Sequence, residues 1–172
     1  MPPDPFHDLT EGVVEITARY LLKHYLIDLK IMSLPNFNAK MSDLDYGYSE
    51  TRPTTILPQH LNGKGKLHQT GSQMWSLANI IPLILEPLVD ADDEYWLNFV
   101  CLLRICSLMF ALSISQGEID LLADLIQDYL TGFTKLYRPL IPEHHFLLHY
   151  PRQILMWGPL DTFDTIRMEG KH

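Results

Sequence analysis

The residues with the clearest chemical potential in this sequence lie close to its two ends. At one end, the stretch "IRMEGKH" places the carboxylate of Glu169 among an arginine, a lysine and a histidine. At the other end, "PPDPFHD" contains Asp4 and His7, three residues apart. At this spacing a carboxylate can hydrogen-bond an imidazole and fix its tautomer. From spacing alone we favour an ordinary loop at Asp4 and His7, with the hydrogen-bonded pair as the alternative.

A second set of potential ligands is the histidine cluster His144, His145 and His149. On one helix, His145 and His149 would stand at positions i and i+4, a spacing at which two imidazoles can share a metal ion. The metalloprotease motif H-E-x-x-H needs a glutamate directly after the first histidine, and Phe146 occupies that position. We therefore favour packed or hydrogen-bonded histidines near a helix end, with metal binding by His145 and His149 as the alternative.

Helical periodicity runs through the segments that must position these groups. Apolar residues recur every three or four positions after Asp8 and cover more than half of the circumference, which predicts a central helix that Pro35 ends. Asp8 and Glu11 have the spacing of a capping box at its start, and the pairs Thr70–Gln73 and Ser115–Glu118 repeat this spacing before two later helices. Further helices are predicted at residues 70–87, 90–114, 115–139, 142–149 and 152–157, with a last one from about residue 164.

Between the first two helices the periodicity is lost. Residues 43–69 are punctuated by glycines and prolines, and they predict a long irregular loop that lies on the surface. No segment shows the alternation of a strand, and no heptad is sustained. The sequence therefore predicts a single all-α domain over residues 1–172, an irregular bundle of about six helices packed ridges into grooves.

Composition and charge restrict the classes of function. The chain has 172 residues, of which 47% are hydrophobic and 20% charged, an ordinary balance for one globular domain. Its formal net charge of -8 argues against tight binding of DNA or RNA by this chain alone. The sequence contains no P-loop, no dinucleotide fingerprint and no nucleophile elbow.

The two cysteines indicate a protein of a reducing compartment, and the most apolar segment favours a core helix over a membrane span. Cys101 and Cys106 are five positions apart in one apolar run, which favours buried free thiols over a disulfide or a zinc pair. The run "WLNFVCLLRICSLMFALSI" is long enough to cross a bilayer, but Arg104 near its middle favours a buried core helix. The start of the chain does not have the pattern of a signal peptide.

Several segments, in order, resemble one continuous region of animal transposases of the CACTA (En/Spm) type. They are "PPDPFHDLTEGVV", "FNAKM...DYGY", "GSQMWSLANIIPLIL", "EYWLNFVCLLRI", "IPEHHFLLHYPRQILMWGPL" and "IRMEGKH", and they span nearly the whole chain. Relatives read "LPPDxMHDxxEGV", "KHHFxxHYP" and "RFEAKH" at the corresponding places. The chain departs from the last pattern at Met168 and Gly170, where phenylalanine and alanine are usual.

The resemblance implies an RNase H-like nuclease that a helical insertion interrupts between its second and third catalytic acids. Glu169 would be the third acid, and Asp4 and His7 would form the D-x-x-H motif that follows the second acid. The alternative for Asp4 is the second acid itself. The complete enzyme would use Mg²⁺, act on DNA and work in the nucleus. One carboxylate cannot hold two metal ions, so we expect this chain to be a transposon-derived fragment that is inactive alone.

Two other functions remain open from the sequence. A helical interaction module, co-opted from the same source, would expose an apolar surface for a protein partner or for self-association. A small metal-binding domain would bring His7, His145 and His149 close enough to share one ion.

Overall fold

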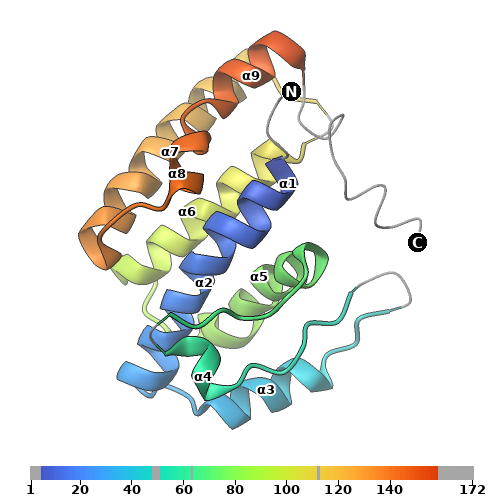
Figure 1. Cartoon of the computed structure of the whole chain (residues 1–172), viewed down its shortest axis with the longest axis vertical. Helices are drawn as coiled ribbons and strands as arrows, with labels where there is room; N and C mark the ends of the chain where they lie inside the picture. The colour runs from blue at the N-terminus through green and yellow to red at the C-terminus, as the bar shows by residue number, and fades with distance from the viewer. Residues whose placement is uncertain (1–4, 48–50, 63, 112, 159–172) are drawn as a thin grey trace.

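The computed structural model describes residues 5–47, 51–62, 64–111 and 113–158, and every regular element within these ranges is a helix, as the sequence predicts. Figure 1 shows the arrangement. In chain order the elements are α1 (Pro5–His7), η1 (Asp8–Val14), α2 (Glu15–Leu22), η2 (Lys23–Asp28), α3 (Leu34–Asp43), α4 (Pro58–Leu61), α5 (Gly71–Leu85), η3 (Glu86–Leu88), α6 (Glu94–Met109), α7 (Gln116–Tyr137), α8 (Pro142–Leu147) and α9 (Tyr150–Trp157).

The first four elements form one continuous helix, because the residues at each junction keep right-handed helical backbone angles. The turns of η1 and η2 are wider, of the π type. This helix is the centre of the molecule: η1 contacts α5 and α8, and α2 contacts α4 and α6. Its apolar side chains are largely buried, and Leu9, Val13 and Leu22 are fully so. The predicted central position is therefore confirmed.

Both predicted ends of the central helix are wrong. Asp8 is not its cap, because His7 already has helical backbone angles and the helix begins at Pro5. The helix ends at Asp28, and Lys30 follows with a positive φ of 54°. Pro35 begins a helix instead of ending one, since a proline in the first turn has no N–H that the helix needs. It lies in the first turn of α3, a helix that the sequence analysis did not predict.

Within the described residues, the segment after α3 is irregular except for α4, and its interior is not a solvated surface loop. Ile56, Leu61 and Leu67 are buried. The side-chain amide of Asn38 on α3 exchanges two hydrogen bonds with the backbone of Ile56, at 2.8 and 3.0 Å. The backbone N–H of Leu67 donates to Oε1 of Glu15 on the central helix, at 3.1 Å. These contacts hold the segment against the helical core.

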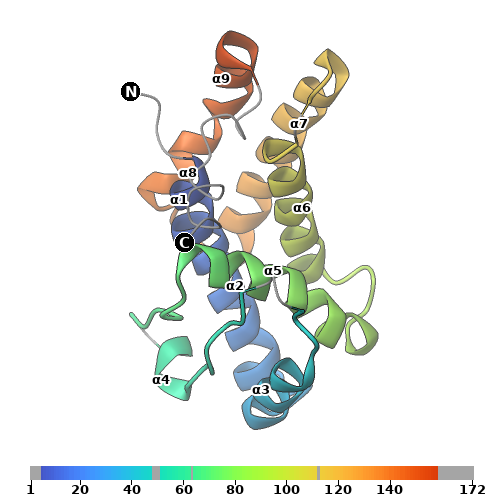
Figure 2. The same ribbon diagram turned by 90° about the vertical axis from the view of Figure 1, so that its right-hand side faces the viewer.

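Two of the three predicted capping boxes are present, and they fix where the long helices start. Thr70 and Gln73 cap α5, and Ser115 and Glu118 cap α7. α6 begins after Asp93, whose carboxylate accepts from the N–H groups of Tyr95 and Trp96. α6 and α7 lie side by side as an antiparallel pair, as Figures 1 and 2 show.

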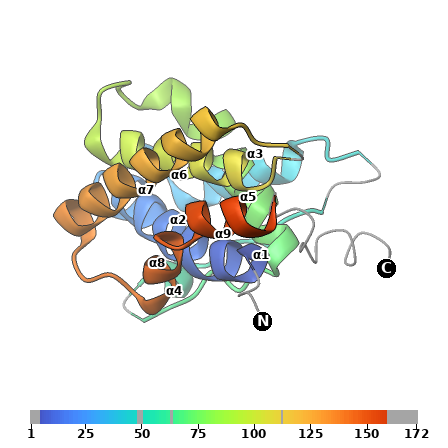
Figure 3. The same ribbon diagram turned by 90° about the horizontal axis from the view of Figure 1, so that it is seen from above.

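The last two described helices return to the start of the chain. α8 packs on η1 and α9 packs on α7 (Figure 3). Pro142 and Pro151 lie in their first turns, as expected for a residue without an N–H. The consequence is that residues near position 150 lie beside residues near position 8.

The two cysteines are free thiols, as predicted, with Cys106 fully buried and Cys101 partly buried. Among the described residues, no helix has the length and apolar character needed to cross a membrane.

Candidate functional site

Of the three residues that the sequence places in a catalytic corner, the structure describes one. Asp4 and Glu169 lie outside the described residues. His7 ends α1 with its side chain 39% exposed, and its Nε2 lies 3.9 Å from Oε1 of Glu11, one turn further along the helix. Whether Asp4 orients the His7 ring, as the spacing predicts, stays a prediction.

The surroundings of His7 bring together residues from both ends of the described chain. The hydroxyl of Tyr150, at the start of α9, donates to Oδ2 of Asp8 at 3.3 Å. Tyr150 is fully buried. We call His7, Asp8, Glu11 and Tyr150 the N-terminal corner. It combines an imidazole with two carboxylates on one helical face.

Close packing next to this corner depends on a glycine. A Cβ on Gly12 would lie only 2.7 Å from Cγ of Glu143, so α8 lies directly on the backbone of η1 there. This contact holds the start of α8 against the first two turns of the chain and sets the position of the segment that leads to α9.

His144 is buried and belongs to a hydrogen-bonded chain that links α8, α7 and the central helix. Its Nδ1 accepts from the backbone N–H of Ile141 at 2.9 Å, so the neutral ring carries its proton on Nε2. Nε2 then donates to Tyr129 Oη at 3.1 Å, and Tyr129 donates to Thr17 Oγ1 at 2.7 Å. Thr17 donates onward to the carbonyl of Val13 at 2.7 Å. Each donor in this chain has one acceptor.

The surroundings of His144 keep its imidazole neutral. Burial, with a smaller contribution from the neighbouring His145, lowers the pKa of His144 to about 4. Burial also raises the pKa of Tyr129 well above its ordinary value. Both nitrogens of His144 are engaged, so this ring holds helices together and does not bind a ligand. The favoured interpretation of a packed, hydrogen-bonded histidine is confirmed for His144.

His145 and His149 are both exposed, and they do not share a helix. α8 ends at Leu147 and α9 begins at Tyr150, so the two histidines lie on either side of a junction between helices, and metal binding by this pair stays a prediction. Pro151 lies in the first turn of α9, where a proline favours a new start over a continued helix. Within the part of the chain that the structure describes, no three His, Cys, Asp or Glu residues are grouped so that they could hold a metal ion.

Sequence reasoning missed two members of the buried chain. In the sequence, Tyr129 stands out only as one apolar position of a helical pattern, and Thr17 does not stand out at all. Neither residue has a local sequence signal for its partner, because the Thr17–Tyr129 bond joins residues 112 positions apart.

Comparison of this chain with protein-family models, with curated proteins and with solved structures gives no match.

Proposed function

We propose that this chain is the helical insertion of a transposase resembling the CACTA (En/Spm) type, with His7 at its entry and Glu169 at its exit. The observation that supports this proposal most is the Tyr150–Asp8 hydrogen bond, which returns the end of the helical excursion to its beginning. An insertion within a nuclease needs this geometry, because the acids on either side of it must meet at one metal site. The close contact of Gly12 with Glu143 adds to the same support.

The chemistry proposed for the complete enzyme is the transfer of a phosphoryl group to or from DNA, assisted by two Mg²⁺ ions. The ions stabilise the attacking and leaving oxygens, and several carboxylates must hold them. In this proposal Glu169 supplies one of those carboxylates, and the His7 imidazole, oriented by Asp4, lies beside the site. The remaining acids belong to strands of the nuclease core, so the chain by itself has no nuclease activity.

A nicking and strand-joining assay tests the proposed inactivity. Purified chain is incubated with supercoiled and linear DNA in Mg²⁺ or Mn²⁺, beside the Glu169→Gln variant. We expect both proteins to match the buffer control. Metal-dependent cleavage that Glu169→Gln abolishes would contradict the proposal, because Glu169 would then act in a complete site.

A second candidate function, a helical interaction module, has support from exposed apolar side chains on the last two helices. Phe146, Leu148, Leu155 and Met156 are between 40% and 62% exposed, within eleven consecutive residues. Exposed apolar side chains that lie together in one patch are typical of a protein-binding surface. Light scattering after size exclusion tests for self-association, with Leu155→Lys together with Met156→Lys as the disrupting variant. Leu83→Lys on α5, also exposed, is the matched control.

A further inference from the structure

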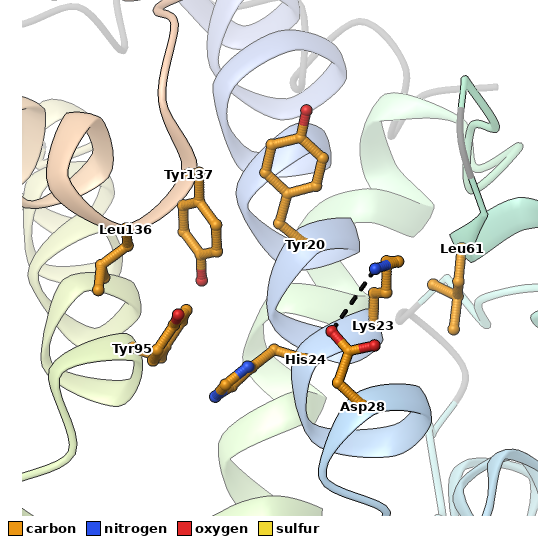
Figure 4. Close-up of a pocket in the computed structure, with 8 residues that line it drawn as sticks. All are labelled: Tyr20, Lys23, His24, Asp28, Leu61, Tyr95, Leu136 and Tyr137. Atoms are coloured by element: carbon orange, nitrogen blue, oxygen red, sulfur yellow. Dashed lines mark hydrogen bonds and ion pairs between the residues drawn. The ribbon is translucent and has the colours of Figure 1, made fainter.

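A pocket of about 480 Å³ opens between the central helix, α4, α6 and α7, away from the N-terminal corner (Figure 4). Half of its eight lining residues carry rings, three tyrosines and one histidine, and the lining comes from helices that are distant in sequence. The lining residues are Tyr20, Lys23, His24, Asp28, Leu61, Tyr95, Leu136 and Tyr137.

The rings of the pocket are held in place by contacts with one another. The Tyr137 ring lies 5.2 Å from that of Tyr20 and 5.5 Å from that of Tyr95, between centroids. The imidazole of His24 stacks on Tyr95 at 3.6 Å. Behind them, the fully buried Phe133 contacts both Tyr20 and Tyr137. Rings fixed in this way lose little freedom when a ligand enters, so the pocket is organised in advance.

One buried polar atom of this cluster makes no hydrogen bond within the described residues. This atom is the hydroxyl oxygen of Tyr137. Buried hydroxyls are usually paired, and unpaired ones are found where a ligand or another group completes the bonding. The oxygen can accept from the N–H of a guanidinium group, whereas a quaternary ammonium has no N–H and would interact with the rings alone.

The charges around the pocket favour a cation as that ligand. Burial lowers the pKa of His24, so its ring is neutral at pH 7, and the nearby carboxylates of Asp93 and Asp28 only partly oppose this shift. The one full positive charge in the lining is Lys23, which is paired with Asp28 at 3.5 Å. Asp93, which accepts from the hydroxyl of Tyr25, adds a further negative charge nearby. Phosphate recognition needs unpaired cations, which this lining does not supply.

We propose that this pocket binds an organic cation, a quaternary ammonium or a guanidinium group, among the rings of Tyr20, Tyr95 and Tyr137. Aromatic rings attract such cations through the negative charge of their faces, and the attraction grows when water is excluded. A free quaternary ammonium compound and the arginine or methylated-lysine side chain of a partner protein share this chemistry. The inference does not depend on the transposase proposal, because it uses no residue of the N-terminal corner.

Titration of the whole chain followed by NMR of its tyrosine rings tests the proposal. The probes are choline, its uncharged carbon isostere dimethylbutanol, and capped arginine. We expect one of the two cations to bind at least about tenfold more tightly than the isostere, from the cation–π attraction at a partly desolvated site. Choline alone binding identifies a small-molecule site, and capped arginine alone identifies a site for a protein side chain. Equal affinity for the isostere, or no binding of either cation, would overturn the proposal.

Two exposed residues give variants that leave the aromatic core intact. Asp28→Asn removes a negative charge and should weaken cation binding several-fold, whereas Lys23→Met removes the competing positive charge and should strengthen it. If Asp28→Asn strengthened cation binding and Lys23→Met weakened it, the charge argument for a cation would be wrong. Tighter binding of adenosine monophosphate than of choline would identify a nucleotide site. Either result excludes the proposal. His145→Gln, at an exposed position that does not line the pocket, should bind as the unmodified chain does.

Discussion

The hydroxyl of Tyr150 donates a hydrogen bond to the carboxylate of Asp8, a contact between residues 142 positions apart. It joins the start of α9 to the first turns of the central helix, and the packing of α8 on η1 strengthens the same junction. The last two described helices therefore lie against the first turns of the described chain. This geometry is the basis of the proposed function.

The neutral His144 should make the domain sensitive to acid. Its pKa of about 4 in the folded state lies below the ordinary 6.5, so the unfolded chain binds the proton more readily between these values. Stability should be fully present above pH 6.5 and fall, on the order of 3 kcal/mol in total, as the pH decreases from about 6.5 to about 4. Urea denaturation across this range measures the loss.

Substitution of the imidazole should remove that pH dependence. His144→Gln keeps a donor toward Tyr129 but cannot titrate, so its stability should change less between pH 4 and 6.5 than that of the unmodified chain. His145→Gln, at an exposed position beside it, is the control for the loss of a surface histidine. An equal slope in the His144→Gln variant and the unmodified chain would show that another group is responsible.

The contact between α6 and α7 should not tolerate a methyl group at Gly132. A Cβ there would lie 2.7 Å from Nδ2 of Asn98, and this side chain is 6% exposed and donates to the carbonyl of Tyr129 at 3.0 Å. Because relief of this contact moves the Asn98 amide away from the carbonyl of Tyr129, we expect Gly132→Ala to reduce the free energy of unfolding by about 1–3 kcal/mol.

A second glycine of the same helix is the matched control. A Cβ on Gly117 would meet only Oγ of Ser115, at 4.0 Å. Gly117→Ala should therefore raise stability by up to about 1 kcal/mol, since alanine is the better helix former. Thermal denaturation of both variants checks the pair, and Asn98→Ala should partly rescue Gly132→Ala. A Gly132→Ala protein as stable as Gly117→Ala would refute the predicted clash.

The main helices could be predicted from the sequence because their signals are local. The capping boxes at Thr70 and Ser115 depend on residues three positions apart, and the structure places helix starts there. The same signal failed at Asp8, where the contact with Tyr150 and the earlier start of the helix override it. Pro35 was misread because a proline both ends and begins helices, and only the cap at Ser33 decides between the two.

The functional features depend on contacts between distant segments, and the sequence could not predict them. His144 was expected to be packed or bonded, but its partners Tyr129 and Thr17 come from other helices. The aromatic pocket has no motif, because Tyr20, Tyr95 and Tyr137 meet only after three helices have packed. The transposase proposal, in turn, depends on resemblance and on residues at the two ends of the sequence.

The chain should bind DNA weakly. With 21 acidic and 13 basic residues, its net charge of -8 repels the phosphate backbone. We expect a dissociation constant weaker than about 10⁻⁶ M at physiological salt, with little preference for sequence. Fluorescence anisotropy of a labelled duplex, titrated at several salt concentrations, measures it. A tight complex at physiological salt would show that local basic groups outweigh the overall charge.

The central claim is that Asp4 and Glu169 lie close together at one site, and a distance measurement tests it most directly. Spin labels are attached at positions 4 and 169, with Cys101 and Cys106 replaced by alanine, and a second pair joins 169 to the exposed Lys40 on α3. Because α3 lies at one end of the long axis, far from α1 (Figure 1), the second pair is the long reference. We expect the distance between the labels at positions 4 and 169 to be clearly shorter than the distance between those at positions 40 and 169. A distance from 4 to 169 equal to or longer than the reference would contradict it.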